Sequence, residues 1–147
     1  MVVSAATIAL GTLNSATYVT GSVDVEVGTN ARNGVTVTAK STNSGLTSVT
    51  TSAAINSLTA DGVADSYKFT SALNAASDST VSGYTQSSSL STEVNSTTAH
   101  TIYTTNKPEA LNGTNDITLS VSAKVNAQTP AATDYTDTVQ ITVTGNF

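Results

Sequence analysis

Four stretches of the chain alternate apolar residues one by one with Thr, Ser or charged residues. The clearest begins at Ile117 and ends at Asn126, with Ile, Leu, Val and Ala at odd positions and Thr, Ser and Lys at even ones. The same period of two occurs over 23–27, 35–40 and 138–144. Successive side chains of a strand point to opposite faces, so each stretch predicts a strand with one buried face.

Turn-forming residues separate these stretches and complete an all-β pattern. Asn112-Gly113 precedes the stretch at Ile117, and Thr129-Pro130 separates the last two stretches, which we expect to form a C-terminal hairpin. Weaker strands are predicted around 67–70 and 100–103. The pattern predicts an immunoglobulin-like antiparallel β-sandwich of about seven or eight strands with Greek-key connections.

The rest of the body gives weaker signals. Single helical turns are predicted over 53–58 and 71–76, and a polar surface loop over 77–98. The 147 residues fit one domain, and no composition shift marks a boundary within 14–147.

The first ten residues are apolar on both faces if they are extended. Val2, Ala6, Ile8 and Leu10 then lie on one side, which is typical of a strand buried on both faces. Two interpretations stay open: residues 1–13 are a strand donated to a neighbouring copy, or they are the first strand of their own sandwich. The segment lacks the basic residues of a signal peptide, so we assign it to the mature fold.

Composition favours an exported structural protein. Only 10% of the residues are charged, where an average soluble domain has about 25%. Low charge with abundant Ser and Thr is typical of secreted walls, fibres and coats. The net charge of −5 and five scattered basic residues argue against nucleic acid. No apolar run is long enough to predict a membrane span.

The sequence offers little from which to build a catalytic site. It has no Cys, no Trp and one His, and His100 is expected on a strand, where nothing singles out a neighbouring Ser as a nucleophile. We therefore expect a protein that is not an enzyme, with no catalytic residue and no cofactor.

Three carboxylate pairs are the candidates for acid–base or metal chemistry: Asp24 with Glu26, Asp61 with Asp65, and Asp134 with Asp137. Solvated carboxylates are the favoured interpretation of all three. A calcium site at 61–65 or 133–137 is the main alternative, although neither segment matches an EF-hand loop. We predict no metal site.

Two kinds of modification are considered. Asn95 and Asn112 begin glycosylation sequons, which matter only where exported proteins are glycosylated. A crosslink between a buried Lys and Asn is disfavoured, because Lys40, Lys68 and Lys124 are expected to point outward or are ambiguous.

The segment 129–144 carries a family resemblance. Pro130, Tyr135 and Asp137, followed by alternating Thr and Val, resemble the closing segment of secreted pilin-like sandwich proteins, among them spore coat protein U-type domains and chaperone–usher fimbrial subunits. The chain departs from them at 132–133, where Gly is usual, and in having no disulfide. Tyr135 also resembles the tyrosine corner of immunoglobulin-like sandwiches, with a packing tyrosine as the favoured alternative.

The resemblance implies a way of joining subunits, in which the N-terminal strand of one copy completes the sheet of the next. We therefore expect a secreted or cell-surface structural subunit that self-associates into a homopolymer, with export or assembly factors as partners. Val2, Ala6, Ile8 and Leu10 are the predicted interface. An adhesin or carbohydrate-binding module, and a virion tail, fibre or decoration protein, are the alternatives.

Overall fold

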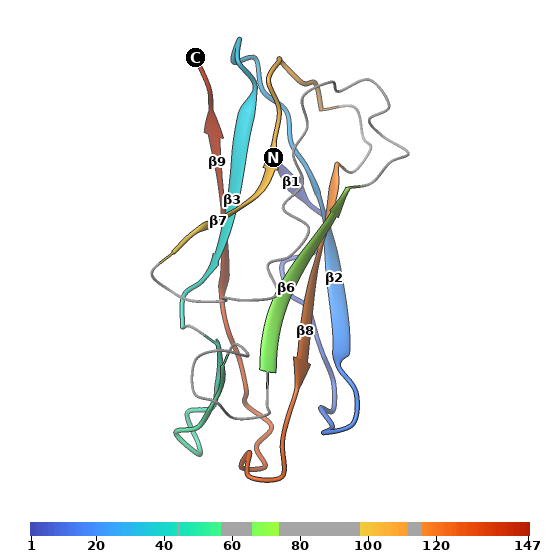
Figure 1. Ribbon diagram of the computed structural model, residues 1–147, viewed down its shortest axis with the longest axis vertical. Helices are drawn as coiled ribbons and strands as arrows, with labels where there is room; N and C mark the ends of the chain where they lie inside the picture. The colour runs from blue at the N-terminus through green and yellow to red at the C-terminus, as the bar shows by residue number, and fades with distance from the viewer. Residues whose placement is uncertain (44, 57–65, 74–97, 112–115) are drawn as a thin grey trace.

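The computed structural model describes residues 1–43, 45–56, 66–73, 98–111 and 116–147, which form antiparallel strands and contain no helix (Figure 1). The described strands are β1 (Val2–Val3), β2 (Val19–Glu26), β3 (Val35–Ser41), β4 (Gly45–Thr47), β5 (Ala54–Asn56), β6 (Ser66–Leu73), β7 (His100–Thr104), β8 (Ile117–Lys124) and β9 (Val139–Gly145). The predicted all-β class is confirmed. Within the described residues, no helix exists that is long and apolar enough to cross a membrane.

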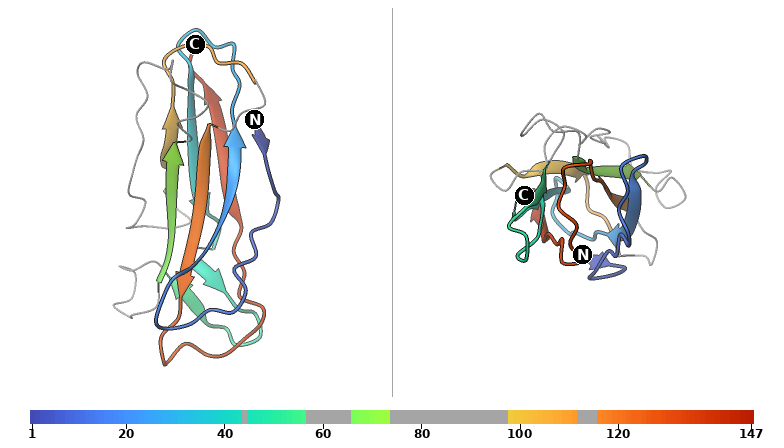
Figure 2. Two further views of the ribbon diagram at one scale, coloured as in Figure 1. Left: turned by 90° about the vertical axis from the view of Figure 1, so that its right-hand side faces the viewer. Right: turned by 90° about the horizontal axis from the view of Figure 1, so that it is seen from below.

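The strands form two main sheets that face each other. One has the order β1-β2-β8-β6 and the other the order β7-β3-β9, while β4 and β5 pair as a separate hairpin. An end-on view shows the two layers with the core between them (Figure 2). The β-sandwich prediction therefore holds for the described part of the chain.

The core forms where the apolar positions of the two sheets meet. β8 lies between β2 and β6, so both of its edges are hydrogen-bonded and its odd-numbered residues point inward. Tyr67 and Phe69 of β6 pack edge to face, with ring centroids 5.4 Å apart. The buried apolar residues are Val23, Val25, Val27, Ala31, Val35, Val37, Ala39, Leu46, Ile55, Tyr67, Phe69, Ile102, Tyr103, Ile117, Leu119, Val121 and Ala123.

Two local expectations are wrong. The last two strands do not form a hairpin: β8 pairs with β2 and β6, whereas β9 pairs with β3 in the other sheet, so the chain crosses between layers over 125–138. The described parts of the two expected helical turns are strands instead, since Ala54–Asn56 is β5 and β6 continues to Leu73, while 57–58, 74–76 and nearly all of the expected loop over 77–98 lie outside the described residues. In both places, pairing with a neighbouring strand overrides a local preference for turns.

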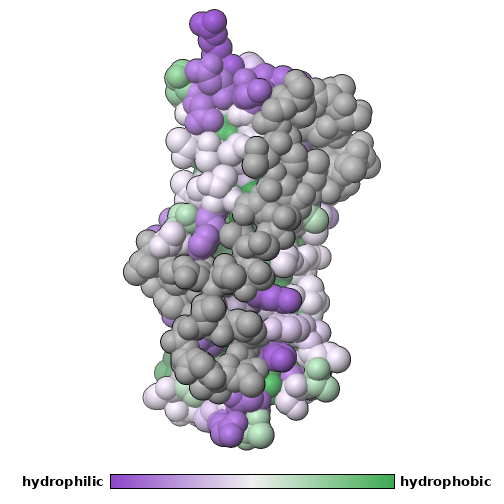
Figure 3. All heavy atoms as spheres, in the orientation of Figure 1, coloured by the Kyte–Doolittle hydropathy of each residue, from purple (hydrophilic) through white to green (hydrophobic). Residues whose placement is uncertain are grey.

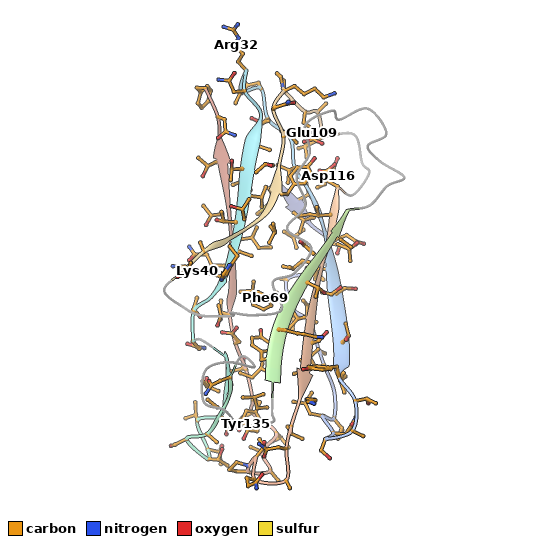
Figure 4. The ribbon with its side chains drawn as sticks, in the orientation of Figure 1. Arg32, Lys40, Phe69, Glu109, Asp116 and Tyr135 are labelled. Atoms are coloured by element: carbon orange, nitrogen blue, oxygen red, sulfur yellow. The ribbon has the colours of Figure 1, made fainter. Side chains whose placement is uncertain are left out.

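The described surface carries few charges. Most of it is pale in Figure 3, because Thr, Ser, Ala and Gly lie near the middle of the hydropathy scale. Strongly hydrophilic residues gather at the top of that view, where Arg32 lies in Figure 4.

Candidate subunit interface

An open groove of 1280 Å³ runs along one side of the sandwich, between the N-terminal segment and β9. We name residues 1–13 the N-terminal arm and this hollow the arm groove. Its floor is apolar and includes Val23, Leu119 and Val121 from the inner faces of β2 and β8. The arm forms one wall, and residues of 129–141 form the other.

The β9 wall presents an unpaired main-chain edge. β9 is bonded along its length to β3, and among the described residues no strand pairs with its other edge. Its inward apolar residues, Val139, Ile141 and Val143, are only half-buried. A free edge next to half-covered apolar side chains is a template for adding a strand.

The arm is attached to its own sandwich over a short length. β1 pairs with β2, with Val2 opposite Glu26 and Val3 opposite Val25. Ser4 N then donates to Asp24 O at 2.9 Å, and Asp24 N donates to Ser4 Oγ at 2.8 Å. From residue 5 to residue 13 the arm makes no backbone hydrogen bond to the described part of the chain.

One side chain of the arm fits a specific notch. A Cβ atom at Gly21 of β2 would lie 2.4 Å from Ile8 Cγ2 and 3.5 Å from Leu10 Cδ2. Only glycine leaves enough space there for Ile8 to rest on the strand. Gly21 therefore contacts the arm, which the alternation of β2 does not reveal, although a Gly inside a strand pattern does signal close approach.

The arm ends at a hinge and an anchor. Gly11 has φ +69 with nothing within 4 Å of its Cβ position, so it turns freely. Asn14 begins the anchored body: its Oδ1 accepts from Ala16 N and Thr17 N, and its carbonyl accepts from Val125 N at 3.2 Å. The chain can therefore change direction at Gly11, and the bonds of Asn14 fix the position of the residues that follow.

The structure brings together only some of the predicted interface residues. Ile8 and Leu10 pack half-buried against the core, whereas Val2 is 52% exposed and Ala6 is exposed. Bends at Ser4 and Ala6 interrupt the alternation. The apolar side expected for an extended strand is therefore not used as a unit within this chain.

A polar cluster closes one end of the groove. Tyr67 donates its hydroxyl to Asp137 Oδ2 at 3.0 Å, and burial beside this carboxylate raises the pKa of Tyr67. Asp134 accepts from Ser48 Oγ at 2.5 Å through one oxygen, and from Thr50 N and Oγ1 through the other. These bonds lower the pKa of Asp134 from 3.8 to about 2.

Tyr135 forms a hydrogen bond within the 125–138 connection. It lies in the lower part of the molecule in Figure 4, and its hydroxyl donates to Pro130 O at 2.9 Å while its ring packs against the core. A hydroxyl bonded to backbone five residues upstream is the kind of contact that a tyrosine corner makes. Tyr135 thus combines both interpretations made from the sequence.

The other candidate residues that the structure describes do not form a site. Glu26 is 8% exposed rather than solvated, because β1 covers this end of β2. His100 is half-buried opposite Ala39, with its Nε2 buried and without a hydrogen-bond partner. Among the described residues no three His, Asp or Glu side chains gather as metal ligands. Asp61, Asp65, Asn95 and Asn112 lie outside the described residues.

An aromatic platform is not found among the described residues. Tyr67, Phe69 and Tyr103 are buried in the core, and Tyr18 lies beneath two lysine side chains. Comparison with protein-family models, with curated proteins and with solved structures finds no match to this chain. The geometry of the arm and its groove is therefore the basis for inferring a function.

Proposed function

We propose that this protein is a structural subunit of an extracellular filament, pilus or coat, in which copies join by β-strand complementation. The observation that carries the proposal is the arm groove: an apolar hollow flanked by the free edge of β9 and by an arm with few backbone bonds. The proposed occupant of each groove is the N-terminal arm of another copy. The chain thus supplies both the strand and its acceptor.

The sequence of the arm fits a straight strand better than its bent path in this chain. A straight strand places Val2, Ala6, Ile8 and Leu10 on one side. In the bent path Ile8 and Leu10 are half-buried, while Val2 and Ala6 face solvent. An arm received from a neighbour is free of the short connection to its own β2, so it can straighten and bury the whole side.

The expected gain comes from main-chain bonds and from apolar burial. Each added hydrogen bond along the β9 edge contributes about 1 kcal/mol net. Completing the burial of Val2 adds about 1 kcal/mol, since full burial of a Val side chain is worth roughly 1.5–3 kcal/mol. Several such bonds exceed the two-residue pairing that holds β1 on its own sheet.

The geometry of exchange leads to an open polymer. The arm and the groove are different surfaces of one molecule, so their contact is heterologous, and such contacts form filaments when the rotation between copies does not close a ring. The hinge at Gly11 lies at the end of the arm that adjoins Asn14. A released arm therefore remains tied to its body at that end.

Electron microscopy of the purified full-length protein tests the proposal directly. We expect filaments, and we expect soluble subunits when residues 1–13 are deleted. A synthetic peptide of residues 1–13 should bind the shortened protein and stabilise it. If the full-length protein stays monomeric at high concentration and the deletion only unfolds it, the donated-strand mechanism is wrong.

A disulfide experiment separates exchange from self-docking, since the chain has no native cysteine. In Ile8→Cys with Gly21→Cys, the smaller Cys replaces Ile8, and a disulfide can form with whichever arm, the chain's own or a neighbour's, places residue 8 on the notch. Arm exchange predicts a ladder of covalent oligomers on a non-reducing gel. A single monomer band with an internal disulfide contradicts exchange. Ile8→Cys with Thr142→Cys, which places the second thiol on the outer side of β9, is the matched control.

A further inference from the structure

The outer face of the four-stranded sheet has opposite charges at its two ends. We define the outer face as the side of β2, β8 and β6 that points away from the core; these strands lie side by side toward the viewer in the left panel of Figure 2. Between its ends the face carries mostly hydroxyl residues and small side chains: Thr20, Ser22, Thr70, Ala72, Thr118, Ser120 and Ser122.

The basic end is built around one tyrosine. Lys68 Nζ lies 4.0 Å from the centre of the Tyr18 ring, and Lys124 Nζ lies 5.3 Å from it. Cation–π attraction holds both ammonium groups at this place. Neither lysine forms an ion pair with the described residues, so two of the chain's five basic residues converge here without a carboxylate partner.

The acidic end lies at the opposite end of the same strands. Asp24 is half-buried on the outer face and accepts from Thr118 Oγ1 at 2.6 Å. Glu26 and Asp116 are buried nearby and add negative potential at this end. Lys124 and Thr118, which mark the two ends on β8, are six residues apart, or roughly 20 Å along a strand.

We propose that the outer face binds the outer face of a second copy, with the strands of the two copies antiparallel. A two-fold axis between the faces and perpendicular to the strands places Lys68 and Lys124 of each copy over Asp24 of the other. An axis parallel to the strands would place lysine over lysine. Charge therefore selects the antiparallel pair, in which the same surface serves both copies.

The size of the face sets the strength of the pair. Three eight-residue strands cover roughly 14 Å by 27 Å, or about 400 Å² for each copy, which is about half of what each partner buries in a standard stable interface. Free subunits should therefore pair weakly. Subunits already joined in a filament would present many such faces at once, and the sum would bundle filaments side by side. The pairing itself does not depend on arm exchange.

Ser120 supplies a direct probe because it lies near the centre of the face, on the middle strand and between the two charged ends. Near a two-fold axis, a residue approaches its own counterpart. We expect Ser120→Cys to form disulfide dimers about tenfold faster than Thr142→Cys, which lies on the outer side of the other sheet. The comparison uses full-length protein at low salt, and equal rates overturn the proposal.

Charge reversal tests the register of the pair. Lys68→Glu with Lys124→Glu should slow dimerisation of Ser120→Cys about tenfold, as should Asp24→Lys alone, and the three reversals together should restore the rate. Raising the salt concentration to 1 M should also slow it. Lys40→Glu, on the outer side of the other sheet, is the control and should change nothing.

The pattern of outcomes separates the alternatives. If reversing the two lysines slows dimerisation of Ser120→Cys while Asp24→Lys does not, the basic end binds an external anionic partner and the proposed pairing is wrong. If the triple variant stays as slow as its parents, the reciprocal register is wrong. If filaments form but do not associate side by side at low salt, the proposed bundling is wrong, whereas the proposed arm exchange is still supported. If no filament forms, the disulfide rates still decide the pairing.

Discussion

β8 and β9 have the same alternation of apolar and hydroxyl residues, but their surroundings differ. β8 has strands on both edges, and Leu119 at its centre is 1% exposed. β9 has a strand on one edge, and Ile141 is only half-buried beside the arm groove. Alternation defines which face of a strand is apolar, whereas the neighbouring strands determine how far that face is covered. In the proposed assembly, the arm of a second copy would cover the exposed part of β9.

The largest expected effect is the loss of apolar volume from β8. Leu119→Ala should lower the free energy of unfolding by about 3 kcal/mol, because it leaves a cavity in a closed core. Ile141→Ala, the matched change in β9, should cost about 1 kcal/mol, since the groove already admits water. Urea unfolding of both variants measures the difference. Equal losses would mean that β9 is as fully covered as β8.

The next largest loss of stability is expected at Asp116, the residue that immediately precedes β8. Asp116 is 3% exposed, and its Oδ2 accepts from Val27 N at 2.5 Å. Asp116→Ala leaves that amide buried without a partner, so we expect a loss of about 2 kcal/mol in unfolding free energy. Asp24→Ala removes a carboxylate bonded to a single half-buried hydroxyl and should cost about 0.5 kcal/mol. A reversed order of the two variants would contradict this role.

A smaller effect on stability, but a large one on assembly, is expected at β9. Ile141→Asp places a carboxylate on the wall of the groove and should cost about 1 kcal/mol in the isolated subunit, because the charge can reach water. It should nevertheless abolish filaments, since an incoming arm would bury that charge. Thr142→Asp, pointing to the other side of β9, should leave filaments intact. Sedimentation and electron microscopy distinguish the two variants.

The sequence predicts the strands of this protein better than it predicts their neighbours. Alternation around Val25, Val37 and Leu119 is enough to identify buried faces, because the period of two is a local property. Alternation does not show that β9 belongs to the opposite sheet from β8. The connection 125–138 could equally form a hairpin loop or a crossing from one sheet to the other. Alternation also misses Gly21, whose role arises only when the arm lies across β2.

The smallest effect lies in the connection that leads into β9, where Asp134 is half-buried, whereas Asp116 is buried. Asp134 bonds Ser48 and Thr50, and its pKa falls from 3.8 to about 2 in the folded protein. A lowered folded pKa stabilises the protein above pH 3.8, and this contribution is lost as the pH falls through about 2.

Asp134→Asn should therefore be slightly less stable than the wild type at pH 6, and the two unfolding curves should converge as the pH falls from 4 to 2. Thermal unfolding at several pH values gives the comparison. In a Ser48→Ala, Thr50→Ala background the effect of Asp134→Asn should shrink, because its two side-chain donors are gone. A difference between Asp134→Asn and wild type that persists unchanged at pH 2 would show that the carboxylate does not hold the connection through these bonds. The entry into β9 would then depend on Tyr67 and Asp137 instead, whose bond at 3.0 Å lies at the same end of the groove.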